Sequence, residues 1–180
     1  MNATVVHING WPGCGKLTIG RALRDRIGAC LVHNHLFPDR ASALFERGTK
    51  ARAALRGRLR DMLCKAARDL PADRPIIVTD ALAETDRHGA LFDKTVRLAE
   101  ATSRTLRAVV LDISADENIR RLTSPARAGI SKLRDPVVLR DLRARHELMH
   151  LLGALKLDVT QMPAATAADG IAEWLKRSDA

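Results

Sequence analysis

Short apolar segments alternate with amphipathic segments along most of the chain. The apolar, often β-branched segments predict five strands, at residues 4–8, 30–32, 75–80, 108–113 and 155–159. Between them, apolar residues recur every three or four positions, as is typical of helices. The helices are expected at residues 16–27, 39–47, 50–70, 90–103 and 114–122, from Asp135 onward, and around residues 166–175.

The regular alternation of strand and helix predicts an α/β fold. The central strands are apolar throughout, which favours a parallel sheet with helices on both faces. Helix boundary signals support this division: Gly28 ends the first helix, Asp135-Pro136 begins a later one, and Thr166 and Asp169 form a predicted capping box. We find no repeat, linker or low-complexity tract, so a single domain spanning residues 1–180 is expected.

The segment between the first strand and the first helix carries the most specific motif. It reads Gly10-Trp11-Pro12-Gly13-Cys14-Gly15-Lys16, which fits the phosphate-loop (Walker A) pattern G-x-x-x-x-G-K. In such a loop the backbone N–H groups and the start of the helix bind phosphate oxygens, and the lysine reaches the β- and γ-phosphates. The sequence therefore predicts that Gly10 to Thr18 bind ATP and that Lys16 is catalytic.

Leu17 departs from the usual motif, in which a Ser or Thr hydroxyl binds Mg²⁺. Thr18 lies about 100° further round the helix and cannot simply replace that hydroxyl; its N–H and hydroxyl could instead meet the α-phosphate. We expect Mg²⁺ to be held more loosely, through waters, nucleotide oxygens and a carboxylate. Asp80 is the best candidate because it ends an apolar strand, and ligands sit at the carboxyl ends of parallel strands. The alternative is that Asp80 only caps a loop.

The composition is that of a soluble globular protein, with 46% hydrophobic residues and a mean hydropathy of −0.13. No apolar run approaches the roughly 20 residues that span a bilayer. The segment before the first strand is too short for a secretory signal, so we expect a cytoplasmic protein with no membrane partner. The three cysteines show no metal-ligand spacing, and Cys14 is expected to fill space in the phosphate loop.

The net charge of +9 is concentrated in residues 47–68, with a net charge of +7, and residues 120–145, with a net charge of +6. The first segment could steer an acidic substrate, but a solvated helix face is the favoured interpretation. The charge also makes a nucleic-acid partner possible. Only 3% of the residues are aromatic, however, so few side chains could stack on nucleic-acid bases.

Three features together resemble the small P-loop kinases, the group of shikimate kinase, gluconate kinase and chloramphenicol phosphotransferase. They are GWPGCGK near the start, the unit VVLDISADENIRRL leading into an Arg-rich loop, and LDVT before a final amphipathic helix. Their order and spacing match across essentially the whole chain, although only the first motif is highly specific. No Asn-Lys-x-Asp segment of the kind that reads guanine is present.

The resemblance implies a three-layer P-loop kinase fold with a five-stranded parallel sheet. It also implies transfer of the γ-phosphoryl group of ATP to a hydroxyl of a small acceptor. An Arg-rich lid would match residues 123–134, with arginines drawn from Arg120, Arg121 and Arg127. Arg127 is the preferred catalytic lid residue and Arg121 the expected nucleotide contact. Because Arg120 and Arg121 point to different helix faces, at most one should face the phosphates.

Relatives in this group build the acceptor site after the second strand, where this chain has His33-Asn34-His35. Several relatives have aspartates there. An imidazole can act as a base at neutral pH. We predict that all three residues contact the acceptor and that His35 is a candidate base, with Asp39 and Asp80 as rivals. A helix cap made by the histidines is the alternative.

Two other functions remain open at this stage. The basic segments are compatible with a polynucleotide or RNA 5′-end kinase, and Leu17 is compatible with a catalytically weak regulatory nucleotide-binding protein. The acceptor and the oligomeric state are not defined by the sequence pattern.

Overall fold

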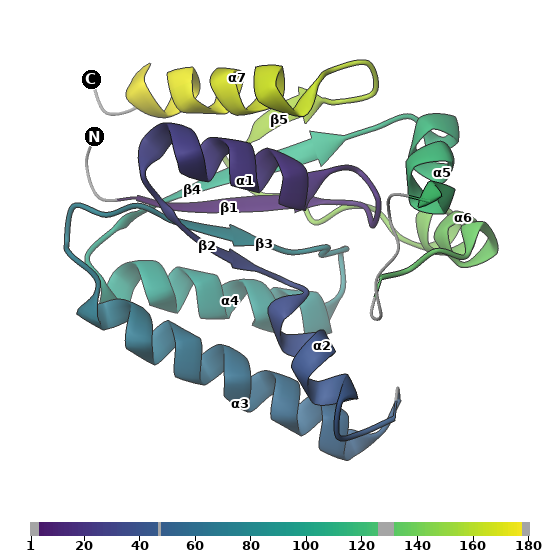
Figure 1. The fold of residues 1–180 in the computed structure, drawn as a ribbon, viewed down its shortest axis with the longest axis horizontal. Coiled ribbons are helices and arrows are strands. Elements are labelled where there is room, and N and C mark those ends of the chain that lie inside the picture. The colour runs from purple at the N-terminus through teal and green to yellow at the C-terminus, as the bar shows by residue number, and fades with distance from the viewer. Residues whose placement is uncertain (1–3, 47, 126–131, 178–180) are drawn as a thin grey trace.

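The computed structural model describes residues 4–46, 48–125 and 132–177. Its five parallel strands form one sheet in the order β2-β3-β1-β4-β5 (Figure 1). The strands are β1 (Thr4–Gly10), β2 (Cys30–His33), β3 (Ile76–Thr79), β4 (Thr105–Asp112) and β5 (Leu155–Asp158). The helices are α1 (Lys16–Ile27), α2 (Leu36–Ser42), α3 (Lys50–Ala66), α4 (Asp86–Ala101), α5 (Ala115–Thr123), α6 (Pro136–Arg145) and α7 (Ala164–Arg177), with a 3₁₀ turn, η1 (Ala67–Asp69).

Helices cover both faces of the sheet, so the predicted three-layer α/β fold is confirmed. Figure 1 shows α1 and α7 on one face and α3 and α4 on the other. Successive residues of a strand point to opposite faces. Val6 and Ile8 of β1 accordingly pack with Leu23 and Ile171 of α1 and α7, whereas Val5 packs on the other face. The sheet is therefore buried on both sides, as its apolar strands require.

The register of the strands brings several loops together at one edge. Ile8 of β1 lies opposite Thr79 of β3, and Gly10 lies opposite Leu111 of β4. His33 of β2 is also paired with Thr79. The segments that follow β1, β2 and β3 therefore leave the sheet side by side, at the carboxyl edge where open α/β sheets bind ligands.

Several helix boundaries differ from the sequence prediction. The helix expected at 39–47 is α2, which begins at Leu36 and ends at Ser42. Pro38 lies in its first turn, where proline is tolerated because no partner is needed for its nitrogen. Helix α4 begins four residues earlier than expected because the Thr85 hydroxyl accepts a hydrogen bond from the His88 N–H and caps the helix.

The expectation of a capping box at Thr166 and Asp169 was wrong. Helix α7 already begins at Ala164, so both residues lie inside it. Asp169 instead forms an ion pair with Arg26 of α1 and ties the two helices of this layer together. In the part of the chain that the structure describes, no helix combines the length and apolar character needed to cross a bilayer.

Candidate active site

The loop between β1 and α1 has the backbone shape of a phosphate-binding loop. Gly13 and Gly15 adopt φ angles of 94° and 104°, in the left-handed region that favours glycine. The Cys14 N–H donates to the Trp11 carbonyl at 3.2 Å and tightens the turn. No side chain caps the start of α1 at Gly15. The start of this 12-residue helix therefore lies directly at the loop, and helix N-termini are common anion-binding positions.

The Lys16 ammonium lies folded against this loop. Its Nζ donates to the Gly10 carbonyl at 2.7 Å and to the Trp11 carbonyl at 2.8 Å, and the residue is 7% exposed. A buried ammonium needs hydrogen-bond partners, and here the loop carbonyls supply them.

The neighbouring residues of the motif divide between the core and the surface. Cys14 is fully buried in the core on the α1 and α7 face, in agreement with a space-filling role. Leu17 is half-buried, and Thr18 is exposed one position further along α1. A hydroxyl is therefore accessible at position 18, whereas the Leu17 side chain has no oxygen that could bind a metal.

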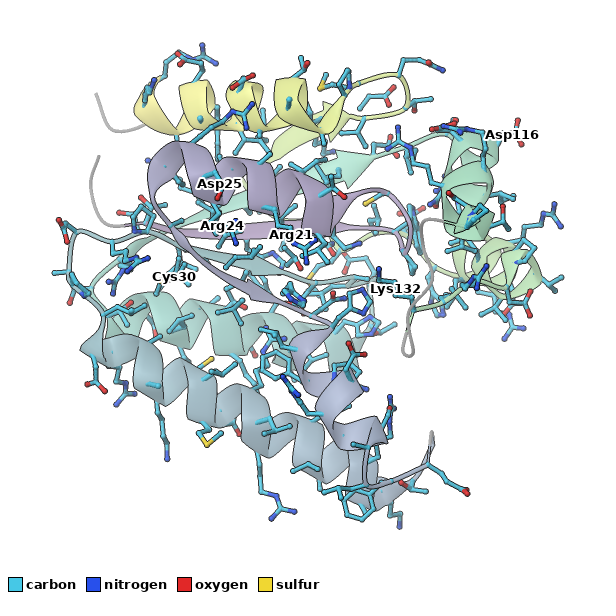
Figure 2. The ribbon with its side chains drawn as sticks, in the orientation of Figure 1. Arg21, Arg24, Asp25, Cys30, Asp116 and Lys132 are labelled. Atoms are coloured by element: carbon cyan, nitrogen blue, oxygen red, sulfur yellow. The ribbon has the colours of Figure 1, made fainter. Side chains whose placement is uncertain are left out.

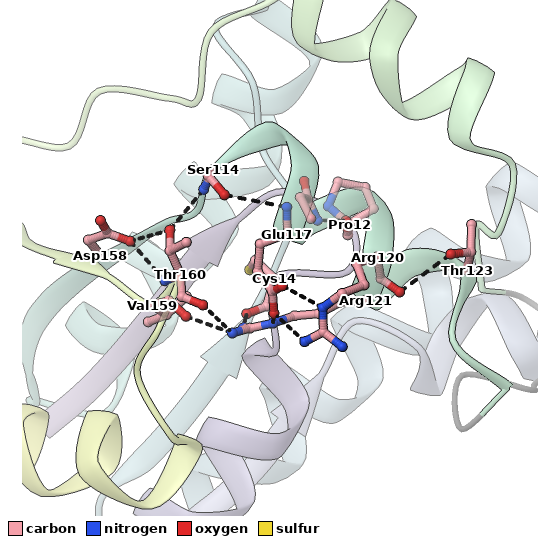
Figure 3. Close-up of polar contacts among 11 residues, drawn as sticks. Pro12, Cys14, Ser114, Glu117, Arg120, Arg121, Thr123, Asp158, Val159 and Thr160 are labelled. Atoms are coloured by element: carbon pink, nitrogen blue, oxygen red, sulfur yellow. Dashed lines mark hydrogen bonds and ion pairs between the residues drawn. The ribbon is translucent and has the colours of Figure 1, made fainter.

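Arg121 of α5 ties the phosphate loop to the segment that follows β5 (Figure 3). Its guanidinium donates to the Cys14 carbonyl at 3.2 Å, to the Val159 carbonyl at 2.8 Å and to the Thr160 carbonyl at 3.0 Å. Its Nε donates to Glu117 at 2.6 Å. Arg121 thus lies at the loop, as expected of a nucleotide contact, and its role in binding stays a prediction.

Glu117 joins Arg120 and Arg121 in one charged group. Hydrogen bonds from Arg120 and Arg121 lower the pKa of Glu117 to about 2. Both arginines reach the same carboxylate, although their Cα positions lie on different helix faces. Only Arg121 also contacts the phosphate loop, whereas the Arg120 side chain is 73% exposed.

A second set of contacts, which the sequence analysis missed, joins the phosphate loop to helices α5 and α6. The fully buried Asn118 donates to the Pro12 carbonyl at 2.9 Å and accepts from Arg143 of α6 at 3.2 Å. The Arg143 guanidinium lies 5.4 Å from the centroid of the Trp11 ring, within the range of a cation–π contact. Trp11 is 8% exposed and serves as packing between the loop and α6. One signal was present in the sequence: Asn118 shares the buried face of α5 with Leu122.

Asp80 follows β3 and forms a buried ion pair with Arg60 of α3. Arg60 donates from Nη1 and Nη2 to the two carboxylate oxygens, at 3.0 and 2.9 Å, and also to Thr95 at 3.2 Å. His7 Nε2 lies 3.4 Å from Asp80 Oδ2, without the geometry of a hydrogen bond. Burial alone raises the pKa of Asp80, but His7 and Arg60 outweigh it and lower the pKa to about 2.

This pairing bears on the predicted metal role of Asp80. Both carboxylate oxygens already accept hydrogen bonds, so a direct bond to Mg²⁺ would require the pair with Arg60 to open. The described residues also contain no cluster of three or more His, Cys, Asp or Glu side chains placed to hold a metal. The assignment of Asp80 to Mg²⁺ stays a prediction, and Arg60 is a partner that the sequence analysis did not anticipate.

The favoured interpretation of the basic segment at residues 47–68 was wrong for two of its arginines. Arg52 and Arg60 are the buried residues of α3, at 7% and 8% exposed. Arg52 donates to the Ser42 hydroxyl at 3.1 Å and so joins α3 to α2. The face of α3 that packs on the molecule is thus partly cationic, whereas Met62 and Leu63 are exposed.

The predicted acceptor residues lie at the end of β2, next to β3. The His33 and His35 rings have centroids 6.3 Å apart, and the Asn34 N–H donates to the Thr79 hydroxyl at 3.4 Å. His35 directly precedes α2, but its side chain makes no capping hydrogen bond to the helix. The contact that the helix-cap alternative requires is therefore not observed. The structure thus brings the three residues to the same edge of the sheet as the phosphate loop.

The predicted lid falls only partly within the described residues. Arg127 lies outside them, so its predicted role is untested. Residues 123–125 and 132–134 are described at either end. Burial lowers the pKa of His33, and the positive charges of Arg21 and Lys132 lower it further.

A large concavity of about 790 Å³ lies elsewhere, between α4, β4 and residues 149–153. It contains none of the predicted site residues. Its connection to the site is indirect: the Phe92 ring on its wall meets the edge of the buried His7 ring, with centroids 5.1 Å apart. We therefore place the candidate site at the phosphate loop, where the donor groups converge, and not in this concavity.

Solved structures that match this fold at low sequence identity include a sugar kinase, a tunicamycin resistance protein and an APS kinase. A sugar kinase from Janibacter sp. HTCC2649 has a TM-score of 0.64 at 20% identity, covering 97% of this chain and 95% of the other. The tunicamycin resistance protein of Deinococcus radiodurans has a TM-score of 0.66 at 17% identity, covering 97% and 96%. The APS kinase of Mycobacterium tuberculosis, solved with AMPPNP and APS, has a TM-score of 0.60 at 14% identity, covering 97% and 98%.

Other matched structures include a gluconokinase and a shikimate kinase. The chain therefore has the fold of the small P-loop kinases, and the resemblance drawn from its motifs is confirmed at the level of the fold. No family model matches the sequence. No curated protein matches it by sequence either.

Proposed function

We propose that this protein is an ATP-dependent kinase that transfers the γ-phosphoryl group to a hydroxyl of a small-molecule acceptor. The observation that carries the proposal is the position of the Lys16 ammonium, which donates hydrogen bonds to the Gly10 and Trp11 carbonyls. It lies in a loop whose turn depends on the positive φ angles of Gly13 and Gly15, at the start of α1. This arrangement places a cation beside the N-terminal end of α1, as polyphosphate binding requires. Kinases of the same fold support the assignment.

The residues present fit ATP better than they fit a directly coordinated metal. The N–H groups of Gly13 and of Gly15 to Thr18 would hold the phosphates, Lys16 would bridge the β- and γ-phosphates, and Arg121 would contact the nucleotide. Mg²⁺, when bound, would neutralise charge on the phosphate oxygens. With carbon at Leu17 and Asp80 paired to Arg60, we expect waters and nucleotide oxygens to supply most of its ligands.

The acceptor hydroxyl would be oriented by His33, Asn34 and His35. As the new bond between the acceptor oxygen and the phosphorus forms, the bond to the β–γ bridging oxygen breaks and the hydroxyl proton passes to a base. A general base is most effective with a pKa near the working pH. Asp80, with a pKa of about 2, is poorly suited to that role. We therefore assign the proton to an imidazole, with His35 as the acceptor contact and base.

Water exclusion would fall to the lid, and Arg127 remains the residue proposed to stabilise the transferred group. The matched structures do not favour the polynucleotide kinase or the regulatory alternative. A cytoplasmic location and an undivided domain stay predictions.

The test is ATP consumption by the purified protein against a panel of hydroxyl-bearing metabolites, nucleosides and antibiotics, with a 5′-hydroxyl oligonucleotide as a further arm. We expect one class of small acceptor to raise ATP consumption at least tenfold over the background, and His35→Gln to abolish most of this gain. His150→Gln, which changes a histidine outside the site, is the matched control. Turnover confined to the oligonucleotide, or none by a protein that binds no ATP, would overturn the proposal.

A further inference from the structure

The concavity of about 790 Å³ beside α4 contains none of the residues assigned to phosphoryl transfer. Its volume lies within the range of small-molecule sites, roughly 300–1,000 Å³. It is formed by the loop before α4, by α4 itself, by β4 and by residues 149–153. Helix α4 covers the face of the sheet opposite α1, whose Arg21 and Arg24 are labelled in Figure 2. The concavity is therefore a separate feature from the phosphate loop.

Backbone hydrogen bonds hold the two sides of the concavity together. The Met149 N–H donates to the Leu82 carbonyl at 3.0 Å, and the Glu84 N–H donates to the Glu147 carbonyl at 3.0 Å. These contacts tie the loop before α4 to the segment that leads into residues 149–153. The hollow between them is thus part of the folded structure.

The interior of the concavity is apolar. Ala108, Met149 and Leu151 are buried in one cluster, and the half-buried Phe92 packs against it. Gly89 lies three positions before Phe92, on the same face of α4. A Cβ added at Gly89 would meet nothing within 4 Å. There is therefore room for an apolar group beside the Phe92 ring.

Glu84 places a carboxylate at the rim of this concavity. Its Oε1 accepts a hydrogen bond from the His150 N–H, and both residues line the hollow. Glu84 is exposed, and among the side chains that the structure describes it has no ion-pair partner. Arg107 also lines the hollow, but it stands between Leu106 and Ala108 in β4, so its side chain starts from the opposite face of the sheet. The rim therefore favours a cationic ligand.

We propose that the concavity binds a small amphipathic amine. The apolar body of this ligand, aromatic or branched, lies against Phe92, Met149 and Leu151, where sulfur and ring contacts favour it. Its ammonium group donates a charge-assisted hydrogen bond to Glu84. A neutral alcohol of the same shape leaves this carboxylate unpaired, and an anion is repelled by it. Because the site is separate from the phosphate loop, its occupancy is independent of the proposed kinase function.

The test follows labelled methionine methyl groups by NMR, in the protein alone and after addition of AMPPNP. Met149 lines the concavity, and Met62, which is exposed on α3, serves as the internal control. The probes share an aromatic body and differ in charge: 2-phenylethylamine, 2-phenylethanol and 3-phenylpropionate. We expect 2-phenylethylamine to shift the Met149 signal saturably and to leave Met62 unchanged. Its Kd should be at least about tenfold lower than those of the other two probes.

Two variants separate the charge of the site from its space. Glu84→Gln should weaken binding of the amine about tenfold and leave binding of the alcohol unchanged. Gly89→Leu extends a side chain into the hollow and should weaken binding of the amine at least about tenfold, in a helix that tolerates leucine better than glycine. Gly170→Leu in α7 is the matched control, because a Cβ added there also meets nothing within 4 Å. It should bind the amine as the wild type does.

Several results would overturn the assignment. They are a Met149 signal that the amine does not shift, equal affinity for the three probes, and unchanged binding of the amine in Glu84→Gln or Gly89→Leu. Competition between AMPPNP and the amine would place the amine at the nucleotide site instead. Sedimentation equilibrium examines a second copy of the chain as the occupant: a dimer that Gly89→Leu dissociates would refute the small-molecule site.

Discussion

The Arg60 guanidinium pairs with both carboxylate oxygens of Asp80, at 3.0 and 2.9 Å, beneath the ends of β2 and β3. Both side chains are almost completely buried, so neither charge can be satisfied by bulk water. The pair joins α3 to the segment that follows β3, the strand next to β1 and its phosphate loop.

We predict that breaking this pair is costly, whereas removing it whole is tolerated. Arg60→Met alone should lower the free energy of unfolding by about 3–5 kcal/mol, because it leaves the Asp80 carboxylate buried and unpaired. Adding Asp80→Asn should recover a large part of that loss. Urea denaturation of the two single variants and the double variant measures both effects, and strictly additive losses would contradict them.

The charged group around Glu117 should make stability depend on pH. The pKa of Glu117 is lowered from 4.5 to about 2, so the carboxylate stabilises the folded state above pH 4.5 and loses this contribution as the pH falls toward 2. Glu117→Gln should therefore be less stable than the wild type at neutral pH, by about 1 kcal/mol at most, since part of the group is solvent-exposed.

The stability difference between Glu117→Gln and wild type should shrink as the pH is lowered below 4.5. Denaturation at a series of pH values checks this. Asp141→Asn is the matched control, because Asp141 forms an exposed pair with Arg145 away from the loop. A difference that grows on acidification would contradict the assignment.

Position 17 should determine how tightly Mg²⁺ is held. Leu17→Ser introduces the hydroxyl that the motif lacks and is expected to lower the Mg²⁺ concentration for half-maximal ATP binding about tenfold. Leu17→Ala is the control, since it shortens the side chain without adding an oxygen. Equal Mg²⁺ requirements in the two variants would show that the metal does not approach this position.

Gly13 should tolerate no side chain. Its φ angle is 94°, and an added Cβ would lie 2.9 Å from Asn118 Nδ2. Gly13→Ala should lower the free energy of unfolding by about 1–3 kcal/mol and weaken ATP binding, because the turn and its Asn118 support cannot both be kept. By contrast, Gly170→Ala in α7 meets nothing within 4 Å and should be neutral or slightly stabilising. Thermal denaturation with and without ATP compares the two variants.

Much of the fold could be predicted because its signals are local. The apolar strands and the helix from Lys16 to Ile27, with its glycine stop, follow from patterns within a few residues. The roles of the glycines and Lys16 in the loop could be predicted equally well, because the motif itself defines their geometry. The boundaries of α2 and α7 were harder to predict, because tertiary contacts can outweigh local capping signals. The ion pair between Arg26 and Asp169 is one such contact.

The residues that support the site depend on contacts between distant segments. Arg60 and Asp80 are 20 positions apart, and Asn118 and Pro12 are 106 apart. In the sequence, Arg60 is one arginine among several on a basic helix, and no periodic pattern marks it as buried. Asn118 did leave a trace, as a polar residue on the apolar face of α5, but its partner could not be inferred without the fold.

Binding of a nonhydrolysable ATP analogue to Lys16→Ala tests the central claim most directly. Isothermal titration of AMPPNP should show that this variant loses at least about 100-fold in affinity while retaining the wild-type thermal stability within a few degrees. Lys176→Ala, which removes an exposed lysine paired with Glu173, should bind as the wild type does. Unchanged AMPPNP affinity in Lys16→Ala would contradict the assignment of this loop as a nucleotide site.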